Sequence, residues 1–504
     1  MTTRIGVAVI GAGFAGIAVA ARLRAAGHDV RIIERAPRVG GTWRDNVYPG
    51  VACDVPSHLY SLADHPHPGW STQFAPGGEI RDYLERIVAE SGLHDVLRLG
   101  VALEHADWDA HARRWRLTLA GGETLHADAL VLACGRLVEP RLPDVPGIAS
   151  FPGPVLHTAR WDAGFDPAGK RIAVIGTGAS AVQLVPQLAR RGAEVTVFQR
   201  TPAWIVPRGG RDYTTAERDR FARHPELIAA LRARLLADDE ARFAARAGHD
   251  RAAADAARSE ATRHLAAQVP PGALRARLTP DYPFGCKRVL RSDDFYPVLA
   301  SGAAVLEPSA LAAVEEGVLV AASGARYADI DAVVLATGFH AQRQPYAEIV
   351  RGEDGMSLAD HWATGMTSFA STVVAGFPNL FVLNGPNAAL AHTSSLLILE
   401  EQAGYVTRAL GRRTAHGGVL RTRPEAERGY TASIDRRARG TSWLGGCDSW
   451  YRDDRSGRLT LLWPGTVADF RAMMAAADGS EFEPAFDSDG RPLTPERLAH
   501  YQEV

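Results

Sequence analysis

Two glycine-rich turns are the residues in this chain whose type and spacing first suggest chemistry. Their small positions are Gly11, Gly13 and Gly16 in the first turn, and Gly176, Gly178 and Ala181 in the second. A turn of this kind between a strand and a helix brings backbone close to a pyrophosphate, and the helix N-terminus attracts the phosphate charge. The chain therefore predicts two dinucleotide sites.

The first turn stands in the strand–turn–helix–strand context that such a site needs. Residues 5–10 are a continuous apolar run, residues 17–26 have a helical composition, and residues 30–33 read as a second strand that ends at Glu34. An acidic side chain at this position accepts hydrogen bonds from ribose hydroxyls and repels a 2′-phosphate. The first site is therefore predicted to bind FAD or NAD.

The second turn has the same context but the opposite charge. Residues 171–175 and 194–198 read as its strands, and the second of them is followed by Arg200 and Thr201. A guanidinium grips a phosphate with two hydrogen bonds. The second site is therefore predicted to prefer NADPH.

The linker between the turns carries a third pattern, Phe-x-Gly-x-x-x-His-x-x-x-Trp-Asp. Its fixed positions are Phe151, Gly153, His157, Trp161 and Asp162. Taken alone, His157 would be read as an ordinary buried histidine. The complete pattern resembles the fingerprint of type I Baeyer–Villiger monooxygenases, flavoproteins that use FAD, NADPH and O2. The resemblance implies that His157 is a hinge residue between domains.

A second signature supports this resemblance. Gly40-Gly41-Thr42-Trp43, Tyr48-Pro49-Gly50 and Asp54 follow at the family's spacing. The resemblance assigns the FAD site to Gly11, Gly13, Ala15, Gly16, Glu34, Thr42, Trp43, Asp54 and Tyr60. It assigns the NADP site to Gly176, Thr177, Gly178, Ala179, Ser180, Ala181, Arg200, Thr201, Lys287, Arg288 and Trp450.

The resemblance also implies a catalytic pair, Arg288 and Asp54. In the family, reduced flavin and oxygen give a C4a-peroxide, whose anion attacks a ketone and yields an ester or lactone. A fixed positive charge stabilises that anion, and arginine does not quench it by giving up a proton. Asp54 would hold the guanidinium of Arg288 in place.

Two other functions fit part of the pattern. Flavin-containing monooxygenases oxidise nitrogen or sulfur, but they typically have Tyr or Phe where Trp161 stands. An NADPH-dependent flavoprotein reductase would share both dinucleotide sites. A disulfide reductase is disfavoured because no Cys-x-x-Cys follows the first turn.

The predicted fold class is α/β, with two Rossmann-type domains. The FAD domain is expected at 1–146 and 340–504, and the NADPH domain at 147–202 and 285–339, with a helical insertion at 203–284. A helix is expected at 79–91 and another at 394–410. Residues 97–101, 106–108 and 115–119 should form a small antiparallel insertion, and the residues after about 477 a polar tail.

Composition limits the partners and the location. The 504 residues carry a net charge of −2, which gives no sign of a nucleic-acid partner. No apolar run is long enough to span a membrane, and no signal-type segment opens the chain. The four cysteines are too scattered for a disulfide framework or a metal site, so we expect reduced thiols in a cytoplasmic protein.

Overall fold

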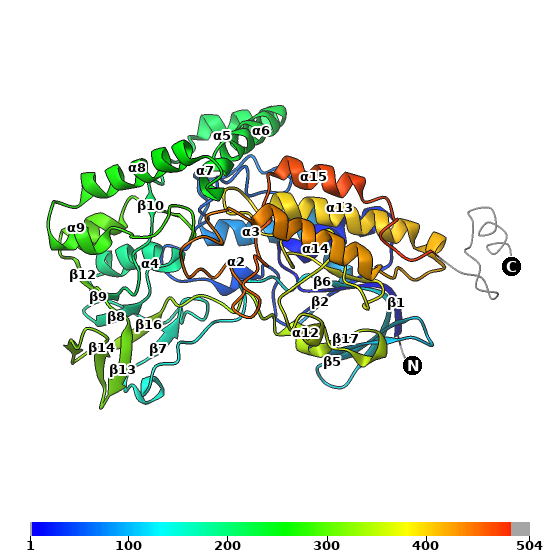
Figure 1. The fold of residues 1–504 in the computed structure, drawn as a ribbon, viewed down its shortest axis with the longest axis horizontal. Coiled ribbons are helices and arrows are strands. Elements are labelled where there is room, and N and C mark those ends of the chain that lie inside the picture. The colour runs from blue at the N-terminus through cyan, green and yellow to red at the C-terminus, as the bar shows by residue number, and fades with distance from the viewer. Residues whose placement is uncertain (1–2, 485–504) are drawn as a thin grey trace.

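The computed structural model describes residues 3–484, in which two large sheets, one mixed and one parallel, are bridged by a helical segment. Figure 1 shows the two sheets side by side, with helices α5 to α8 running above them. The predicted α/β class is confirmed. The polar tail predicted after about residue 477 falls largely outside the described residues.

The first sheet is built around the first glycine turn. Its strand order is β17-β4-β5-β6-β1-β2-β3, and β18 also pairs with β6. The bounds are β1 Thr3–Ile10, β2 Val30–Glu34, β3 Leu97–Leu99, β4 Leu103–Asp109, β5 Arg114–Leu119, β6 Thr124–Leu132, β17 Val350–Arg351 and β18 Leu380–Val382. Strands β3, β2, β1, β6 and β18 run parallel, while β4, β5 and β6 form an antiparallel meander.

One expectation for this sheet is wrong. The strand predicted at 97–101 does not belong to the antiparallel insertion, because Leu97 pairs with Ile32 in a parallel register. Helix α3 (Gly77–Glu90) lies between these strands in the chain. A crossover helix returns the chain in the same direction, and this geometry outweighs the short connection to β4.

Helices cover the first sheet, each burying its apolar residues toward the core. Helix α1 (Phe14–Ala25) buries Ile17, Val19 and Leu23, and it packs against α13 (Leu396–Arg412). Helices α14 (Pro424–Ala438) and α15 (Val467–Ala476) lie on the same side (Figure 1). The shorter elements are α2 Thr42–Asp45, α11 Tyr346–Ile349, α12 Leu358–His361, η1 Leu93–Val96, η3 Glu353–Gly355 and η4 Arg413–His416.

The second sheet is entirely parallel and contains the second glycine turn. Its order is β12-β9-β8-β16-β7, with α4 (Ala179–Arg190) and α10 (Phe295–Ala300) packed together beside it. The strands are β7 Val155–His157, β8 Arg171–Ile175, β9 Glu194–Phe198, β12 Ala304–Glu307 and β16 Ala332–Leu335. A separate antiparallel sheet contains β13 Leu311–Glu315, β14 Val318–Ala321 and β15 Arg326–Tyr327, and η2 spans Ile148–Ser150.

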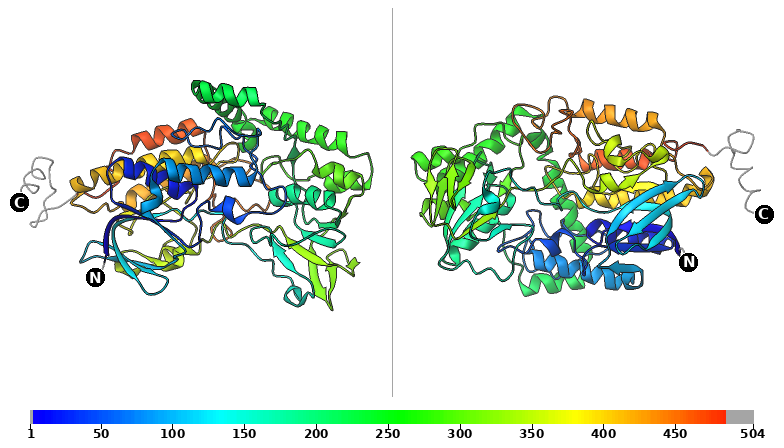
Figure 2. Two further views of the ribbon diagram at one scale, coloured as in Figure 1. Left: turned by 180° about the vertical axis from the view of Figure 1, so that it is seen from behind. Right: turned by 90° about the horizontal axis from the view of Figure 1, so that it is seen from below.

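The insertion is helical, as its composition predicts. Its helices are α5 Thr215–Arg223, α6 Glu226–Glu240, α7 Phe243–Ala247, α8 Arg251–Gln268 and α9 Ala273–Leu278. A capping box between Thr214 and Glu217 starts α5. A parallel pair, β10 (Ile205–Val206) and β11 (Leu290–Arg291), joins the two ends of this segment. Figure 2 shows the same arm of helices from behind.

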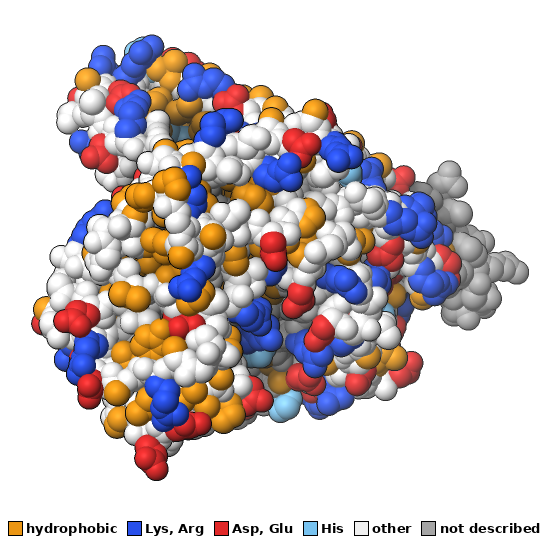
Figure 3. Space-filling model, turned by 60° about the vertical axis from the view of Figure 1, so that its left-hand side comes forward, with side chains coloured by type: hydrophobic (Ala, Val, Ile, Leu, Met, Phe, Trp, Pro, Cys, Tyr) orange, Lys and Arg blue, Asp and Glu red, His pale blue; other side chains and the backbone are white. Residues whose placement is uncertain are grey.

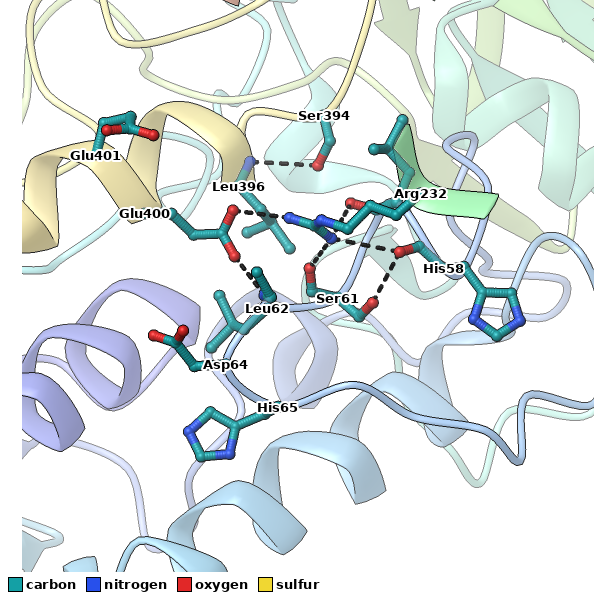
Figure 4. A network of polar contacts seen from close by, with 12 residues as sticks. His58, Ser61, Leu62, Asp64, His65, Arg232, Ser394, Leu396, Glu400 and Glu401 are labelled. Atoms are coloured by element: carbon teal, nitrogen blue, oxygen red, sulfur yellow. Dashed lines mark hydrogen bonds and ion pairs between the residues drawn. The ribbon is translucent and has the colours of Figure 1, made fainter. Parts of the chain in front are cut away.

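The insertion contacts both sheets' domains. Leu265 of α8 packs into the core of the second sheet, while Leu235 and Leu236 of α6 pack against the first. Arg232 of α6 also reaches Glu400 of α13, with 2.7 Å between Nη2 and Oε2, and donates to the carbonyls of residues 58, 59 and 61 (Figure 4). The insertion therefore fixes one domain to the other. The domain boundaries given above remain predictions.

The expectation of four reduced cysteines is wrong for two of them. Cys286 and Cys447 form a disulfide with 6.3 Å between their Cα atoms, whereas Cys53 and Cys134 are free. The two partners are 161 residues apart. Spacing in the sequence gives no sign of a pairing that only the fold creates.

On the face drawn in Figure 3, basic and acidic side chains are interspersed, and neither sign of charge forms a large patch. Among residues 3–484, no helix is both long and apolar enough to cross a membrane.

Candidate active site between two dinucleotide turns

The first turn is shaped by close backbone contacts. Gly11 has a φ of +106°, and a Cβ on Gly16 would lie 1.8 Å from the Gly11 carbonyl oxygen. Gly13 caps α1 without any side-chain hydrogen bond. The first N–H groups of α1 are therefore not capped by a side chain, which suits a phosphate.

Glu34 closes this turn from the end of β2. It is 5% exposed and accepts hydrogen bonds from the backbone N–H groups of Ala12 (2.8 Å) and Ala36 (2.9 Å). Arg44 lies 3.0 Å from the same carboxylate. The carboxylate predicted to receive the ribose is thus held rigidly, and its oxygens retain lone pairs for hydroxyl donors.

Aromatic side chains lie beside the turn. Trp43 is buried, and its Nε1 donates to the Tyr60 hydroxyl at 3.3 Å. Phe14 meets the Tyr60 ring edge-on, at 5.2 Å between centroids. Burial raises the pKa of Tyr60, so its hydroxyl stays protonated. Trp43 and Tyr60, both predicted to contact FAD, therefore lie side by side, with Phe14 packed against them.

The second turn repeats the backbone but leaves cations at its edge. Gly176 has a φ of +109°, and Gly178 caps α4 without a side-chain hydrogen bond. Thr177 donates from Oγ1 to the carbonyl of Thr201 at 3.2 Å. Ala179, Ser180 and Ala181 form the first turn of α4, as predicted for a phosphate site.

Arg200 and Lys287 stand close enough to influence one another. Arg200 is exposed, and Lys287 lies over the Tyr282 ring at 5.0 Å. Burial lowers the pKa of Lys287, and the charge of Arg200 lowers it further. Two neighbouring cations attract an anion, as a 2′-phosphate site requires.

Arg288 and Asp54 meet between the two turns. Nη2 of Arg288 lies 2.7 Å from Oδ2 of Asp54, and about 30% and 27% of these side chains is exposed. Burial alone would raise the pKa of Asp54, but the charge of Arg288 holds it below its ordinary value. The charge of Asp54 in turn raises the pKa of Arg288. The predicted contact is confirmed; the catalytic role remains a prediction.

The cavity around this pair is rich in arginine. Arg246 and Arg291 line it together with Arg288, Asp54 and Asp239. Burial, then Arg291 and Arg288, lowers the pKa of Arg246 to about 10. Among the described residues, Arg246 and Arg291 form no ion pair within 4.0 Å, so positive charge prevails in the cavity. Such a cavity stabilises a developing negative charge.

The fingerprint residues lie along the edge of the second sheet. Gly153 has no room for a side chain, because a Cβ would lie 2.3 Å from the Asp331 carbonyl oxygen. His157 ends β7 and is 5% exposed, and its ring meets Phe339 at 5.9 Å. Phe151 and Trp161 pack into apolar clusters, and Asp162 accepts from the N–H of Gly164 in a turn. The fingerprint segment is therefore a linker that includes β7, the edge strand of the second sheet, and is held there by its packed side chains.

Sequence reasoning missed Arg136. Arg136 follows β6 and donates hydrogen bonds to Asn384 Oδ1 at 3.1 Å and to Ser395 Oγ at 3.0 Å. Burial lowers the pKa of Arg136 to about 10, and the nearby positive charge of Arg288 also lowers it. The available signal was its place directly after the small-residue end of a buried strand. Trp450, by contrast, was predicted but is 40% exposed, and its neighbour Tyr451 is buried.

Comparison with known proteins gives the family. The model of the pyridine nucleotide-disulphide oxidoreductase family matches residues 5–227. A Baeyer–Villiger monooxygenase of Streptomyces coelicolor is 43% identical over 95% of this chain and 92% of its own length. The chain belongs to the Baeyer–Villiger monooxygenase family. A second Baeyer–Villiger monooxygenase, from Pseudomonas aeruginosa, is 38% identical over 94% of this chain and 90% of its own.

Solved monooxygenase structures have the same fold as this chain. An oxidised steroid monooxygenase bound to NADP superposes with a TM-score of 0.84 at 28% identity, over 95% of this chain and 99% of the other. A closed cyclohexanone monooxygenase gives the same score and identity over 96% and 99%. A structure of OTEMO in complex with FAD and NADP superposes with a TM-score of 0.83 at 26% identity, over 96% of this chain and 100% of the other. The predicted family, enzyme class and pair of cofactors, FAD and NADP, are confirmed.

Proposed function

We propose that Arg288 and Asp54 are the catalytic pair with which this monooxygenase converts a ketone, NADPH and O2 into an ester or lactone, NADP⁺ and water. The observation that carries the proposal is their 2.7 Å contact. It joins the segment after the insertion to the loop that follows the first glycine turn. We propose the cytoplasm as the site of the reaction, because the reaction consumes NADPH.

The first turn fits FAD. Gly13 and Gly41 lie against one another, so that a Cβ on Gly41 would be 3.0 Å from the Gly13 Cα. Side chains here would fill the space beside the uncapped start of α1. Bound FAD, once reduced by NADPH, supplies the electron pair that activates O2. The residues assigned to hold it are those of the first turn, with Glu34, Trp43 and Tyr60.

Arg288 supplies a charge that does not change during the reaction. Its pKa is raised by Asp54, so the guanidinium stays protonated at any working pH. It stabilises negative charge on oxygen in the cavity and does not release a proton to it. Asp54 orients the guanidinium through the hydrogen bond at Nη2.

Arg200 and Lys287 are proposed to bind the 2′-phosphate of NADPH, beside the pyrophosphate at the start of α4. Their support is that Arg200 follows β9, where the first site has Glu34, and that its charge acts on Lys287 from the segment after the insertion. Thr201 and Trp450 are proposed to contact the same coenzyme, Trp450 from an exposed position.

Single-turnover kinetics test the catalytic pair. In Arg288→Ala, ester formation should fall by on the order of 10²–10³, because one charged donor is lost from the site. Reduction of the flavin by NADPH should persist. Arg288→Lys should recover only part of the rate, since the ammonium has no planar fork for Asp54.

The control is Arg211→Ala, which removes an exposed arginine that is paired with Glu217 and does not line the cavity. It should keep the full rate. Undiminished ester formation by Arg288→Ala would remove the residue from catalysis. Oxidation of amines and sulfides with no reaction of any ketone would reject the proposed substrate class.

A further inference from the structure

We propose that Cys286 and Cys447 are a reversible redox pair that controls exchange of NADP by fixing the Trp450 loop, residues 441–451, to the segment of Lys287 and Arg288. The proposal rests on the proposed function, because it takes Lys287 and Trp450 as contacts of NADP. Its first observation is the disulfide itself, which joins two segments 161 residues apart.

The bond lies where it can act on the site. Cys286 directly precedes Lys287 and Arg288, and Cys447 comes three residues before Trp450. Tyr451, at the end of the loop, interacts electrostatically with Arg288 and contributes to its raised pKa. The end of the loop therefore lies close to the catalytic pair. A change at the sulfur atoms is therefore transmitted to both proposed contacts of the coenzyme.

Few other contacts hold the middle of the loop. At its start, Ser442 donates its backbone N–H to the carbonyl of Ala247 at 2.8 Å. At its end, Gln342 donates to the carbonyl of Trp450 at 2.8 Å. Within residues 3–484, one polar contact besides the disulfide connects 445–449 to 282–288, that of Cys286 Sγ with the carbonyl oxygen of Gly445 at 3.7 Å, and a disulfide sulfur has no proton to donate. The disulfide is thus the main link between these segments.

The loop has the local freedom to move when that link breaks. Gly445 and Gly446 precede Cys447, and Gly446 has a φ of +87°. Trp450 is 40% exposed. Trp443 and Tyr451 are buried and anchor the loop on either side, so the exposed middle, residues 444–448, is the part that opens at low free energy.

The two sulfur atoms differ in access. Cys286 is 0% exposed and packs in a cluster with Trp204 and Tyr282, whereas Cys447 is partly exposed. A small oxidant or a thiol reductant therefore meets Cys447 first. Cys53 and Cys134 are poor competitors, because burial raises the pKa of both thiols.

Hydrogen peroxide is the oxidant we assign. The Cys447 thiolate attacks a peroxide oxygen, which breaks the O–O bond, releases one water and leaves a sulfenic acid. The Cys286 thiolate then attacks that sulfur and releases a second water. Two thiols and one peroxide thus give one disulfide and two waters, with both electrons taken from sulfur. A dithiol reverses the step by exchange.

The test uses the FAD-loaded enzyme, oxidised with peroxide or reduced with dithiothreitol. Mass spectrometry and thiol titration should find a Cys286–Cys447 cross-link in the first form and four thiols in the second. Trypsin should cleave after Arg452 and Arg455, both exposed, about tenfold more slowly in the oxidised form. Release of NADP⁺, followed by stopped-flow, should slow to a similar degree.

Two variants separate the pair from the other thiols. Cys447→Ser, at a partly exposed position, should behave as the reduced form under both treatments. Cys134→Ala should keep the response of the unaltered chain. Four free thiols after peroxide, or equal cleavage and equal NADP⁺ release in both forms, would overturn the proposal.

A third pattern is also decisive. A cross-link that slows cleavage but leaves NADP⁺ release unchanged would overturn the control of the coenzyme. Thiol titration and cleavage do not depend on turnover. Failure of the Arg288 variants to lose activity would therefore be distinguishable from failure of this inference.

Discussion

The two glycine turns have similar backbone conformations, but the helix packs more closely against the strand in the first turn than in the second. Position 16 of the first turn is glycine, and a Cβ there would lie 1.8 Å from the Gly11 carbonyl oxygen. The matching position of the second turn is Ala181, whose side chain is fully buried in the core of the second sheet. The distance between helix and strand is thus set turn by turn, and the motif alone does not fix it.

The charged residues at the strand ends differ in a second way. Glu34 is almost fully buried and bound to Ala12, Ala36 and Arg44, so it belongs to the turn as much as to any ligand. Arg200 is exposed and makes no ion pair within the described chain. The first site therefore contains a preformed ligand group, and the second presents a free one. This contrast fits a coenzyme that stays and a coenzyme that exchanges.

The largest expected effect comes from closing the first turn. Gly16→Ala should destabilise the chain by about 3 kcal/mol or more, because backbone atoms must move to admit the methyl group. The FAD-to-protein absorbance ratio after purification and the thermal midpoint report this change. Both should fall sharply.

The reverse change in the second turn is the control. Ala181→Gly leaves a small space and adds a glycine to α4, which costs about 1 kcal/mol. It should retain the full complement of FAD. Equal losses in the two variants would refute the difference in packing between the turns.

The next effect concerns the bound carboxylate. Glu34→Gln should lower the free energy of unfolding by about 2 kcal/mol. The amide group of Gln points an N–H at one of the two backbone N–H donors that Glu34 accepts from, and Arg44 loses this carboxylate as a partner. Thermal unfolding of the FAD-free protein isolates this structural part. Glu194→Gln, at the exposed start of β9, should change the stability by less than about 0.5 kcal/mol. Similar shifts for both variants would reduce Glu34 to a surface charge.

The sequence predicted the elements that position the site. Buried parallel strands read as apolar runs, and glycine turns follow them, so both turns were located from residues 5–16 and 171–181. The contact between Arg288 and Asp54, 234 residues apart, was predicted only through the family resemblance. No local periodicity connects an irregular loop to a segment that returns from an insertion.

Other features depend on how loops meet. The Cys286–Cys447 bond joins a return segment to a distant loop, and neither has a periodic pattern. Arg136 meets Asn384 and Ser395 for the same reason. Strand β3 runs parallel to β2 because α3 forms the crossover between them. The short connection from β3 to β4 had instead suggested an antiparallel hairpin. Periodicity predicts elements, whereas contacts between irregular segments arise only from the packed fold.

The smallest expected effect tests the free cation. Arg200→Gln should raise the Michaelis constant for NADPH about tenfold, or about 1.4 kcal/mol, and leave that for NADH unchanged. Thermal stability and FAD content should not change, because Arg200 holds no other element in place. Steady-state kinetics with both coenzymes measure the effect, and Arg191→Gln at the exposed end of α4 is the matched control. If the two Michaelis constants rise together, the guanidinium does not read the 2′-phosphate, and the contrast with Glu34 is one of burial alone.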